Sequence, residues 1–197
     1  MTPGAEVVTR PISAAQAATR HRLLDAARDL ATEGGYEAVG MRNVAARAGV
    51  SAPTAYQYFS SKDHLLVDLL VALVGQTTTM LSDRARPEGS PVERTVATLR
   101  HAVEQVEQAP NLYVAMTRAY ISGSHDVRHA RAAMESSTRQ WIDLAVGESA
   151  IGDRDAIVHI LEDVLFANMV GLVTGSRTPG EIGDQLELAA RTVLREQ

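Results

Sequence analysis

Two short segments with apolar faces, joined by a glycine, constrain the fold more than any other feature of this chain. They lie in the stretch MRNVAARAGVSAPTAYQYFSSKDHLL, residues 41–66. The first segment ends at Ala48, and Gly49 follows, where a tight turn needs the left-handed backbone that glycine adopts without strain. Ser51 can cap the second segment, and Pro53 falls in the first turn, where its missing N–H costs little. The stretch therefore predicts two short helices that meet at a tight turn.

A second helix presented outward in this way is typical of helix-turn-helix proteins, which insert it into the major groove of DNA. We expect Ser51, Ala52 and Thr54 to face base edges. Hydroxyl, amide and cationic groups around them supply donors for phosphates. The predicted DNA-binding residues are Arg42, Ser51, Ala52, Thr54, Tyr56, Gln57, Tyr58 and Lys62. Phe59 is assigned to the core, whereas for Tyr58 a DNA contact is favoured over a core position.

The rest of the chain has helical periodicity and no convincing alternating strand, so the fold class is all-α with about nine helices. A first helix, 15–33, should stop at Gly34 and Gly35. Capping and breaking residues then place further helices at 41–48, from about 52, and at 62–83, 91–108, 111–122, 124–146, 153–174 and 179–195. We predict a DNA-binding domain over residues 1–64 and a ligand-binding and dimerisation domain over residues 65–197.

The charge differs between the two predicted domains, as expected when only the first binds DNA. The net charge is −5, but residues 1–64 carry +1 and residues 65–197 carry −6. The absence of cysteine excludes disulfides and cysteine-based zinc sites and suits a reducing compartment. No run approaches the length of a membrane span, and the first residues lack the apolar stretch of a signal peptide, so we expect a cytoplasmic protein with no membrane partner.

An enzyme is the main competing class. The chain contains no glycine-rich phosphate loop, GxSxG, HExxH or cysteine nucleophile, so we expect no catalysis and no cofactor. His125 and His129 lie four residues apart on one helical face, but no third ligand is evident and no metal site is predicted. A DNA-binding protein with no small ligand is the more serious rival.

Several large apolar residues of the second half are most simply core, with a ligand pocket as the alternative. The predicted ligand-binding residues are Met116, Tyr120, Trp141, Phe166 and Met169. A second set forms an apolar seam on the last two helices, predicted to pair with a second copy. This dimer interface comprises Ile157, Leu161, Leu165, Asn168, Leu172, Leu186 and Val193. For Asn168, fixing the register of the interface is favoured over a bond to the ligand.

The arrangement AxxAGVSxxTxYxYFxSKxxLL resembles the DNA-binding domain of TetR-family regulators, over residues 23–66. The resemblance implies an all-α homodimer, a double-stranded DNA operator and a C-terminal ligand domain. It also implies DNA contacts at Arg42, Thr54, Tyr56, Tyr58 and Lys62. The chain departs from the family at Gly40, where a capping Thr or Ser is usual, and at Ala55, where a larger aliphatic residue often packs.

A narrower resemblance is carried by GGYEAVGMR, HLLV and AMTRAY, and by the spacing of Asp163, Asn168 and Leu172. These segments are similar to KstR-type repressors of steroid catabolism. The resemblance implies a repressor controlled by a small apolar effector with a charged tail, such as a steroid or fatty acyl-CoA.

Overall fold

The structure, a computed structural model, describes residues 13–83, 89–122, 125–147 and 153–194. Over these residues it contains helices and no strand, which confirms the predicted all-α class. The helices are α1 (Ala14–Ala38), α2 (Met41–Arg47), α3 (Ala52–Tyr58), α4 (Lys62–Asp83), α5 (Pro91–Gln108), α6 (Pro110–Ile121), the 3-10 turn η1 (His125–Val127), α7 (Arg128–Val146), α8 (Arg154–Val173) and α9 (Pro179–Val193).

Most predicted helix boundaries agree with the structure to within one or two residues, because local signals place them. Ser90 caps α5 through a reciprocal pair of hydrogen bonds with Glu93, and the Thr178 hydroxyl and Glu181 do the same for α9. The backbone N–H and hydroxyl of each capping residue lower the pKa of the glutamate. The predicted helix start at Ser124 and the predicted end at Arg195 lie outside the described residues.

The predicted stop at the end of the first helix is present, but it interrupts the helix without ending it. Gly34 and Gly35 have non-helical backbone, and Gly35 has φ +65°, as a left-handed stop requires. A further helical turn follows and extends α1 to Ala38, five residues beyond the predicted end. This extra turn carries Tyr36 and Glu37 close to the start of α4.

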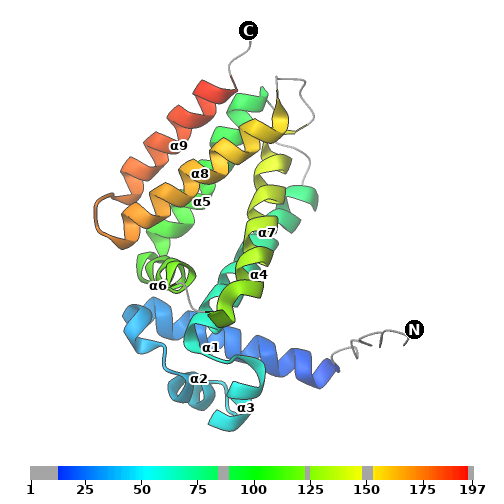
Figure 1. Ribbon diagram of the computed structural model, residues 1–197, viewed down its shortest axis with the longest axis vertical. Coiled ribbons are helices and arrows are strands. Elements are labelled where there is room, and N and C mark those ends of the chain that lie inside the picture. Colours follow the sequence, from blue (N-terminus) through cyan, green and yellow to red (C-terminus); the bar gives the residue numbers. More distant parts are fainter. Residues whose placement is uncertain (1–12, 84–88, 123–124, 148–152, 195–197) are drawn as a thin grey trace, which may run out of the picture.

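The helices surround two apolar cores (Figure 1). One joins α1, α2, α3 and the first half of α4 to α6, through residues such as Leu23, Phe59 and Ala115. The other joins α5, α7, α8 and α9, through residues such as Leu99 and Leu186. In Figure 1, α1–α3 lie at one end, α8 and α9 at the other, and α4 and α6 between them. The domain boundary after residue 64 stays a prediction, because α6 shares the core of α1–α4.

Helix α8 differs from the other helices of the described ranges. It is the one helix there that is long and apolar enough to cross a membrane, judged by length and composition alone. Only 28% of its most apolar stretch is buried within this chain. Core helices and subunit interfaces have the same composition, so the finding is weak support for a membrane span and shows mainly that α8 has uncovered apolar surface.

Candidate DNA-binding surface and ligand cavity

The helix-turn-helix is held by hydrogen bonds that its sequence makes possible. Gly49 has φ +67°, and the N–H of the next residue, Val50, donates to the carbonyl of Ala45 at 3.0 Å. The Ser51 hydroxyl accepts a bond of 3.2 Å from the N–H of Thr54, which caps α3 as predicted. By contrast α2 has no side-chain cap, because Gly40 stands at its N-cap position.

Helix α3 is anchored by its small and aromatic apolar residues. Ala55 and Phe59 have no exposed area and belong to the core beneath α1. Phe59 is therefore a core residue, as predicted. The neighbouring positions on α3 are left at the surface because side chains one residue apart point about 100° apart on a helix.

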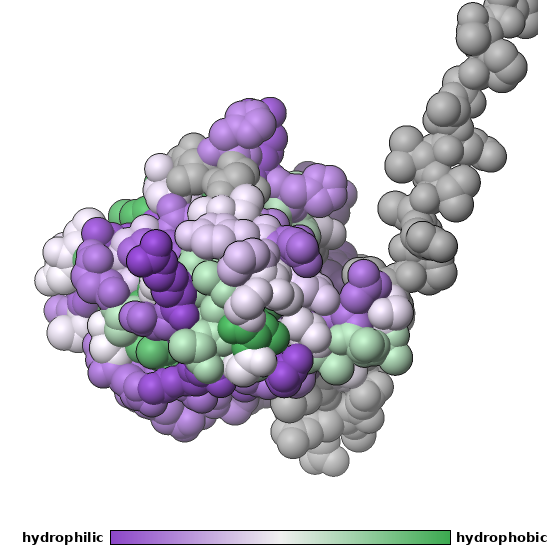
Figure 2. All heavy atoms as spheres, turned by 90° about the horizontal axis from the view of Figure 1, so that it is seen from below, coloured by the Kyte–Doolittle hydropathy of each residue, from purple (hydrophilic) through white to green (hydrophobic). Residues whose placement is uncertain are grey.

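All eight predicted DNA-binding residues retain exposed surface around α3. Those that are exposed are Arg42, Ser51, Tyr56 and Gln57, and those that are partly buried are Ala52, Thr54, Tyr58 and Lys62. The molecule seen from this end is covered largely by polar residues, with small apolar patches between them (Figure 2). Their roles at bases or phosphates remain predictions. The Ser51 hydroxyl is already shared between the cap and the Thr54 hydroxyl, at 2.8 Å.

The cations near this surface differ in the contacts that they make within the chain, and therefore in whether they can bind a phosphate. Arg47 donates two hydrogen bonds, of 2.6 and 2.9 Å, to Glu33, and this contact lowers the pKa of the Glu33 carboxyl. Arg22 donates to the carbonyl of Ala48 at 3.2 Å. Arg42 is exposed and forms no ion pair or hydrogen bond within the described ranges. Of these three, Arg42 is the cation free to bind a phosphate.

Lys62 is predicted to contact DNA, but in the structure its ammonium is held by contacts with Tyr36. Its ammonium lies 3.7 Å from the centroid of the Tyr36 ring and donates to the Tyr36 carbonyl at 3.4 Å. The Tyr36 hydroxyl donates a 2.6 Å bond to Oδ1 of Asp63. Burial, and then Asp63, raise the pKa of Tyr36 to about 12.

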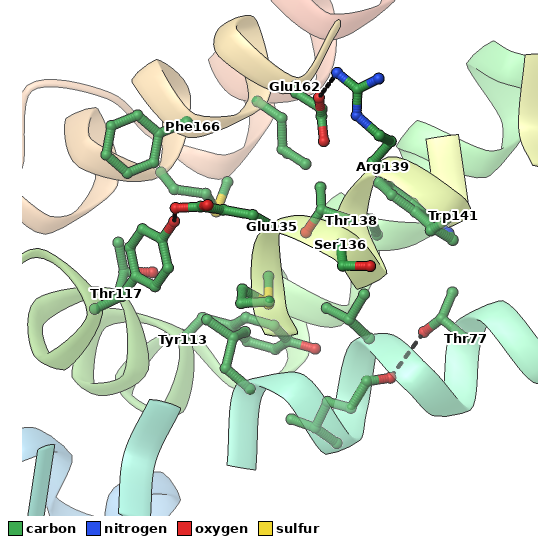
Figure 3. A pocket seen from close by; sticks show the side chains of 18 of the residues that line it. Thr77, Tyr113, Thr117, Glu135, Ser136, Thr138, Arg139, Trp141, Glu162 and Phe166 are labelled. Atoms are coloured by element: carbon green, nitrogen blue, oxygen red, sulfur yellow. Dashed lines mark hydrogen bonds and ion pairs between the residues drawn. The ribbon is translucent and has the colours of Figure 1, made fainter. Parts of the chain in front are cut away.

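A cavity of about 710 Å³ lies among α4, α5, α6, α7 and α8 (Figure 3). Four predicted ligand residues line it: Tyr120, Trp141, Phe166 and Met169. Met116 does not, which corrects the prediction for this residue. Its side chain has no exposed area and packs in the core shared by α1 and α4. The volume is within the range of small-molecule sites.

The sequence predicted Tyr120 at the cavity but gave no expectation for the rest of its polar wall. On α6, Tyr113, Thr117 and Tyr120 are spaced four and three residues apart and face the cavity together. The hydroxyls of Tyr113 and Thr117 form no hydrogen bond with other described residues, and burial raises the pKa of Tyr113. The motif AMTRAY contains two of these positions, and its periodicity is the signal that could have found them.

Charged side chains form the cavity rim, defined as Arg131, Glu135, Arg139 and Glu162. The Tyr120 hydroxyl donates to Glu135 at 3.3 Å, and burial and this carboxylate raise the pKa of Tyr120. Arg139 pairs with Glu162 at 3.4 Å. Arg131 lies 4.9 Å from the centroid of the Tyr120 ring and forms no ion pair with a described carboxylate. The rim thus carries both signs of charge beside apolar walls.

The predicted dimer interface needs correction at several positions. Leu161 and Leu186 have no exposed area and Ile157 has 8%, so all three pack inside the chain's own core and offer no surface to a second copy. Leu165 lines the cavity. Leu172 and Val193 are partly buried against the same core, and their interface role stays a prediction.

Asn168 is also an internal residue rather than an interface residue. It is 1% exposed, its Nδ2 donates to the Val164 carbonyl at 2.8 Å, and its Oδ1 accepts from Arg177 at 2.5 Å. Arg177 also donates to Gln185. The buried amide therefore connects α8 to the turn before α9 within one chain, and its nitrogen and oxygen each have a hydrogen-bond partner there.

Two family comparisons cover most of the chain. Residues 23–69 match the bacterial regulatory proteins of the tetR family, and residues 89–193 match the tetracyclin repressor-like C-terminal domain. The chain belongs to the TetR family. It is accordingly a DNA-binding transcriptional regulator, and the function expected from the helix-turn-helix is confirmed.

Individual TetR-family proteins are similar over nearly the whole length. The transcriptional repressor KstR of Rhodococcus jostii is 34% identical over 92% of this chain and 85% of its own. A TetR regulator from Rhodococcus sp. RHA1 superimposes with a TM-score of 0.77, at 26% identity over 92% of this chain and 98% of its own. Thermus thermophilus FadR in complex with lauroyl-CoA has a TM-score of 0.70, at 23% identity over 90% and 97%. The KstR resemblance noted in the sequence is thus confirmed.

Proposed function

We propose that this chain is a repressor that binds a palindromic DNA operator as a homodimer and loses affinity for it when a small, mainly apolar ligand enters the cavity. The observation that carries the proposal is the cavity of about 710 Å³ between the helices that join the reading head, α1–α3, to α8 and α9. A ligand there contacts α4 and α6, both of which pack against α1.

The chemistry of the wall supports an amphipathic ligand. Leu70, Val74 and Trp141 provide apolar surface, which favours an apolar body. The unpaired hydroxyls of Tyr113 and Thr117 can bond polar atoms on that body. Arg131 at the rim can attract an anionic group. A fatty acyl-CoA or a steroid acyl-CoA combines these features, and the lauroyl-CoA complex of Thermus thermophilus FadR supports the former.

Dimer formation is supported by apolar side chains that one chain leaves uncovered. On α8, Ile160 is 44% exposed, and on α9, Leu188 is 65% exposed. Covering such residues with a second copy removes apolar area from water. A dimer with two reading heads then requires two operator half-sites related by symmetry.

A ligand can shift DNA binding only if it binds the DNA-competent arrangement and the incompetent arrangement with different affinities. A coupling free energy of about 2.7 kcal/mol gives a hundredfold change in operator affinity, which is within the usual allosteric range. Helix α4 begins at Lys62 and lines the cavity at Leu70, so displacement of its middle by a ligand moves the reading head.

The test uses a variant that fills the cavity. Ala102 lines it from α5, whereas Ala97 is exposed on the same helix. Operator affinity is measured by fluorescence anisotropy, with and without saturating lauroyl-CoA or a steroid acyl-CoA. We expect one of these probes to weaken binding in the wild type and in Ala97→Trp, and to have no effect on Ala102→Trp, which still binds DNA.

The rival function, a DNA-binding regulator without a small ligand, predicts a different outcome. Neither probe would then change the melting temperature or the operator affinity of the wild type. That result would end the proposal for these two ligand classes and leave DNA binding intact.

A further inference from the structure

Two cations from distant parts of the chain meet at the last turn of α1. Lys62 begins α4, and Arg118 is on α6. The Lys62 ammonium lies 3.7 Å, and the Arg118 guanidinium 4.1 Å, from the centroid of the same Tyr36 ring. The adjacent residue, Glu37, completes the group. We call Tyr36, Glu37, Lys62 and Arg118 the junction.

The two cations share the Glu37 carboxylate unequally. Arg118 Nη1 is 2.9 Å from Glu37 Oε1, whereas Lys62 Nζ is 3.9 Å from Oε2. Because Coulomb attraction falls with distance, Arg118 makes the stronger ion pair. With its nearest anion neutralised by another cation, Lys62 keeps more of its positive charge available to other partners.

Helix α6 connects the junction to the cavity. Tyr113, Thr117 and Tyr120 line the cavity from α6, and Arg118 follows Thr117 directly but points to α1. Any rotation or translation of α6 that accommodates a ligand also moves Arg118 relative to Glu37, because the helix is a rigid element of 12 residues.

We propose that Arg118 masks the charge of Glu37 and thereby weakens its attraction for Lys62, so that this ammonium can leave the Tyr36 ring and carbonyl to bind a DNA phosphate. The position of α6 then sets the electrostatic potential of the reading head. The inference rests on the proposed function in assigning Lys62 to DNA. Arg118 and Glu37 are positioning residues for Lys62 and contact no DNA themselves.

The direction of the effect follows from charge. When Arg118 withdraws, the negative charge of Glu37, whose side chain is 74% exposed, is no longer compensated beside Lys62. It then attracts the Lys62 ammonium and repels an approaching phosphate. Exposed ion pairs have modest strength, so we expect operator affinity to fall about threefold per reading head, or about tenfold for a dimer that uses two.

A double-mutant cycle tests this without any ligand. Arg118→Met removes the masking charge, Glu37→Gln removes the charge that is masked, and the third variant carries both changes. We expect Arg118→Met to bind operator DNA about tenfold more weakly and with a smaller salt slope. Glu37→Gln should bind at least as well as wild type, and the double variant should return to within about twofold of wild type.

The matched control is Arg154→Met, which removes an ion-paired arginine from the start of α8, outside the cavity, and should leave operator affinity unchanged. Melting temperatures of all variants establish that they fold. An Arg118→Met variant that binds like wild type, or a weakening that persists in the Glu37→Gln background, would overturn the inference. If the wild-type protein binds no operator, the proposed function fails as well, so the two failures are distinguishable.

Discussion

The hydroxyl of Tyr36 donates a 2.6 Å hydrogen bond to Oδ1 of Asp63, and this bond joins the last turn of α1 to the first turn of α4. Asp63 follows Lys62 directly, so the bond orients the start of the helix that carries this cation. The Tyr36 ring in turn receives both cations of the junction. One side chain thus connects the end of α1 with α4 and α6.

Replacing Tyr36 by Phe should lower the free energy of unfolding by about 1 kcal/mol at pH 8, because the variant cannot donate a hydrogen bond to the Asp63 carboxylate. The pKa of Tyr36 is about 12 in the folded protein against an ordinary value of 10, so folding favours the protonated phenol. This contribution is present below pH 10 and is lost as the pH rises to 12. Urea unfolding of both proteins from pH 8 to 12 should show the difference shrinking. A difference that is constant across this range would contradict the assignment.

Removing Arg42 should weaken binding to all DNA sequences and reduce the slope of log affinity against log salt by about 0.9 for each phosphate that is no longer neutralised, or twice that for a dimer. The matched control is Arg47→Ala, since Arg47 is paired with Glu33. Its salt slope should change little. Anisotropy titrations at several salt concentrations measure both variants. Equal slopes for Arg42→Ala and wild type would show that Arg42 contacts no phosphate.

Adding a methyl group at Gly171 should destabilise the protein. A Cβ there would lie 2.8 Å from Cδ of Arg177, so Arg177 must move and Oδ1 of the buried Asn168 loses the hydrogen bond from Arg177. We expect the free energy of unfolding to fall by about 1 kcal/mol, net of the gain in helix propensity. Gly75→Ala on α4 meets nothing within 4 Å and should instead stabilise by about 0.5 kcal/mol. Urea unfolding compares the two. Equal stabilities would show that the Arg177 contact contributes nothing.

Placing a charge on the outer face of α8 should separate the proposed dimer. Ile160→Glu leaves the protomer folded, because the side chain is 44% exposed, but buries a carboxylate against a second copy. We expect the dimer dissociation constant to rise at least about tenfold, with weaker operator binding. Ile121→Glu, at a 37% exposed site on α6, is the control. Sedimentation equilibrium measures both, and an Ile160→Glu protein that remains as dimeric as the control would place the interface elsewhere.

Features that depend on neighbouring residues were predictable from the sequence alone. The Gly49 turn, the Ser51 cap and the bounds of α4 and α5 each follow from a few adjacent residues. Their physical cause is local: a backbone conformation that glycine adopts, or an N–H that a nearby hydroxyl satisfies. The family motif has the same property, since it lies within one continuous segment.

Features that depend on how helices rotate against one another were not predictable in this way. Adjacent residues on a helix point about 100° apart, so packing alone decided that Thr117 faces the cavity while Met116 enters the core. The apolar residues of α8 predicted that this helix is buried, but not whether its own chain or a second copy covers it. The tertiary structure shows that Leu161 is buried within its own protomer. The contact between Tyr36 and Arg118 joins residues far apart in the sequence, and it exists only because α6 packs across α1.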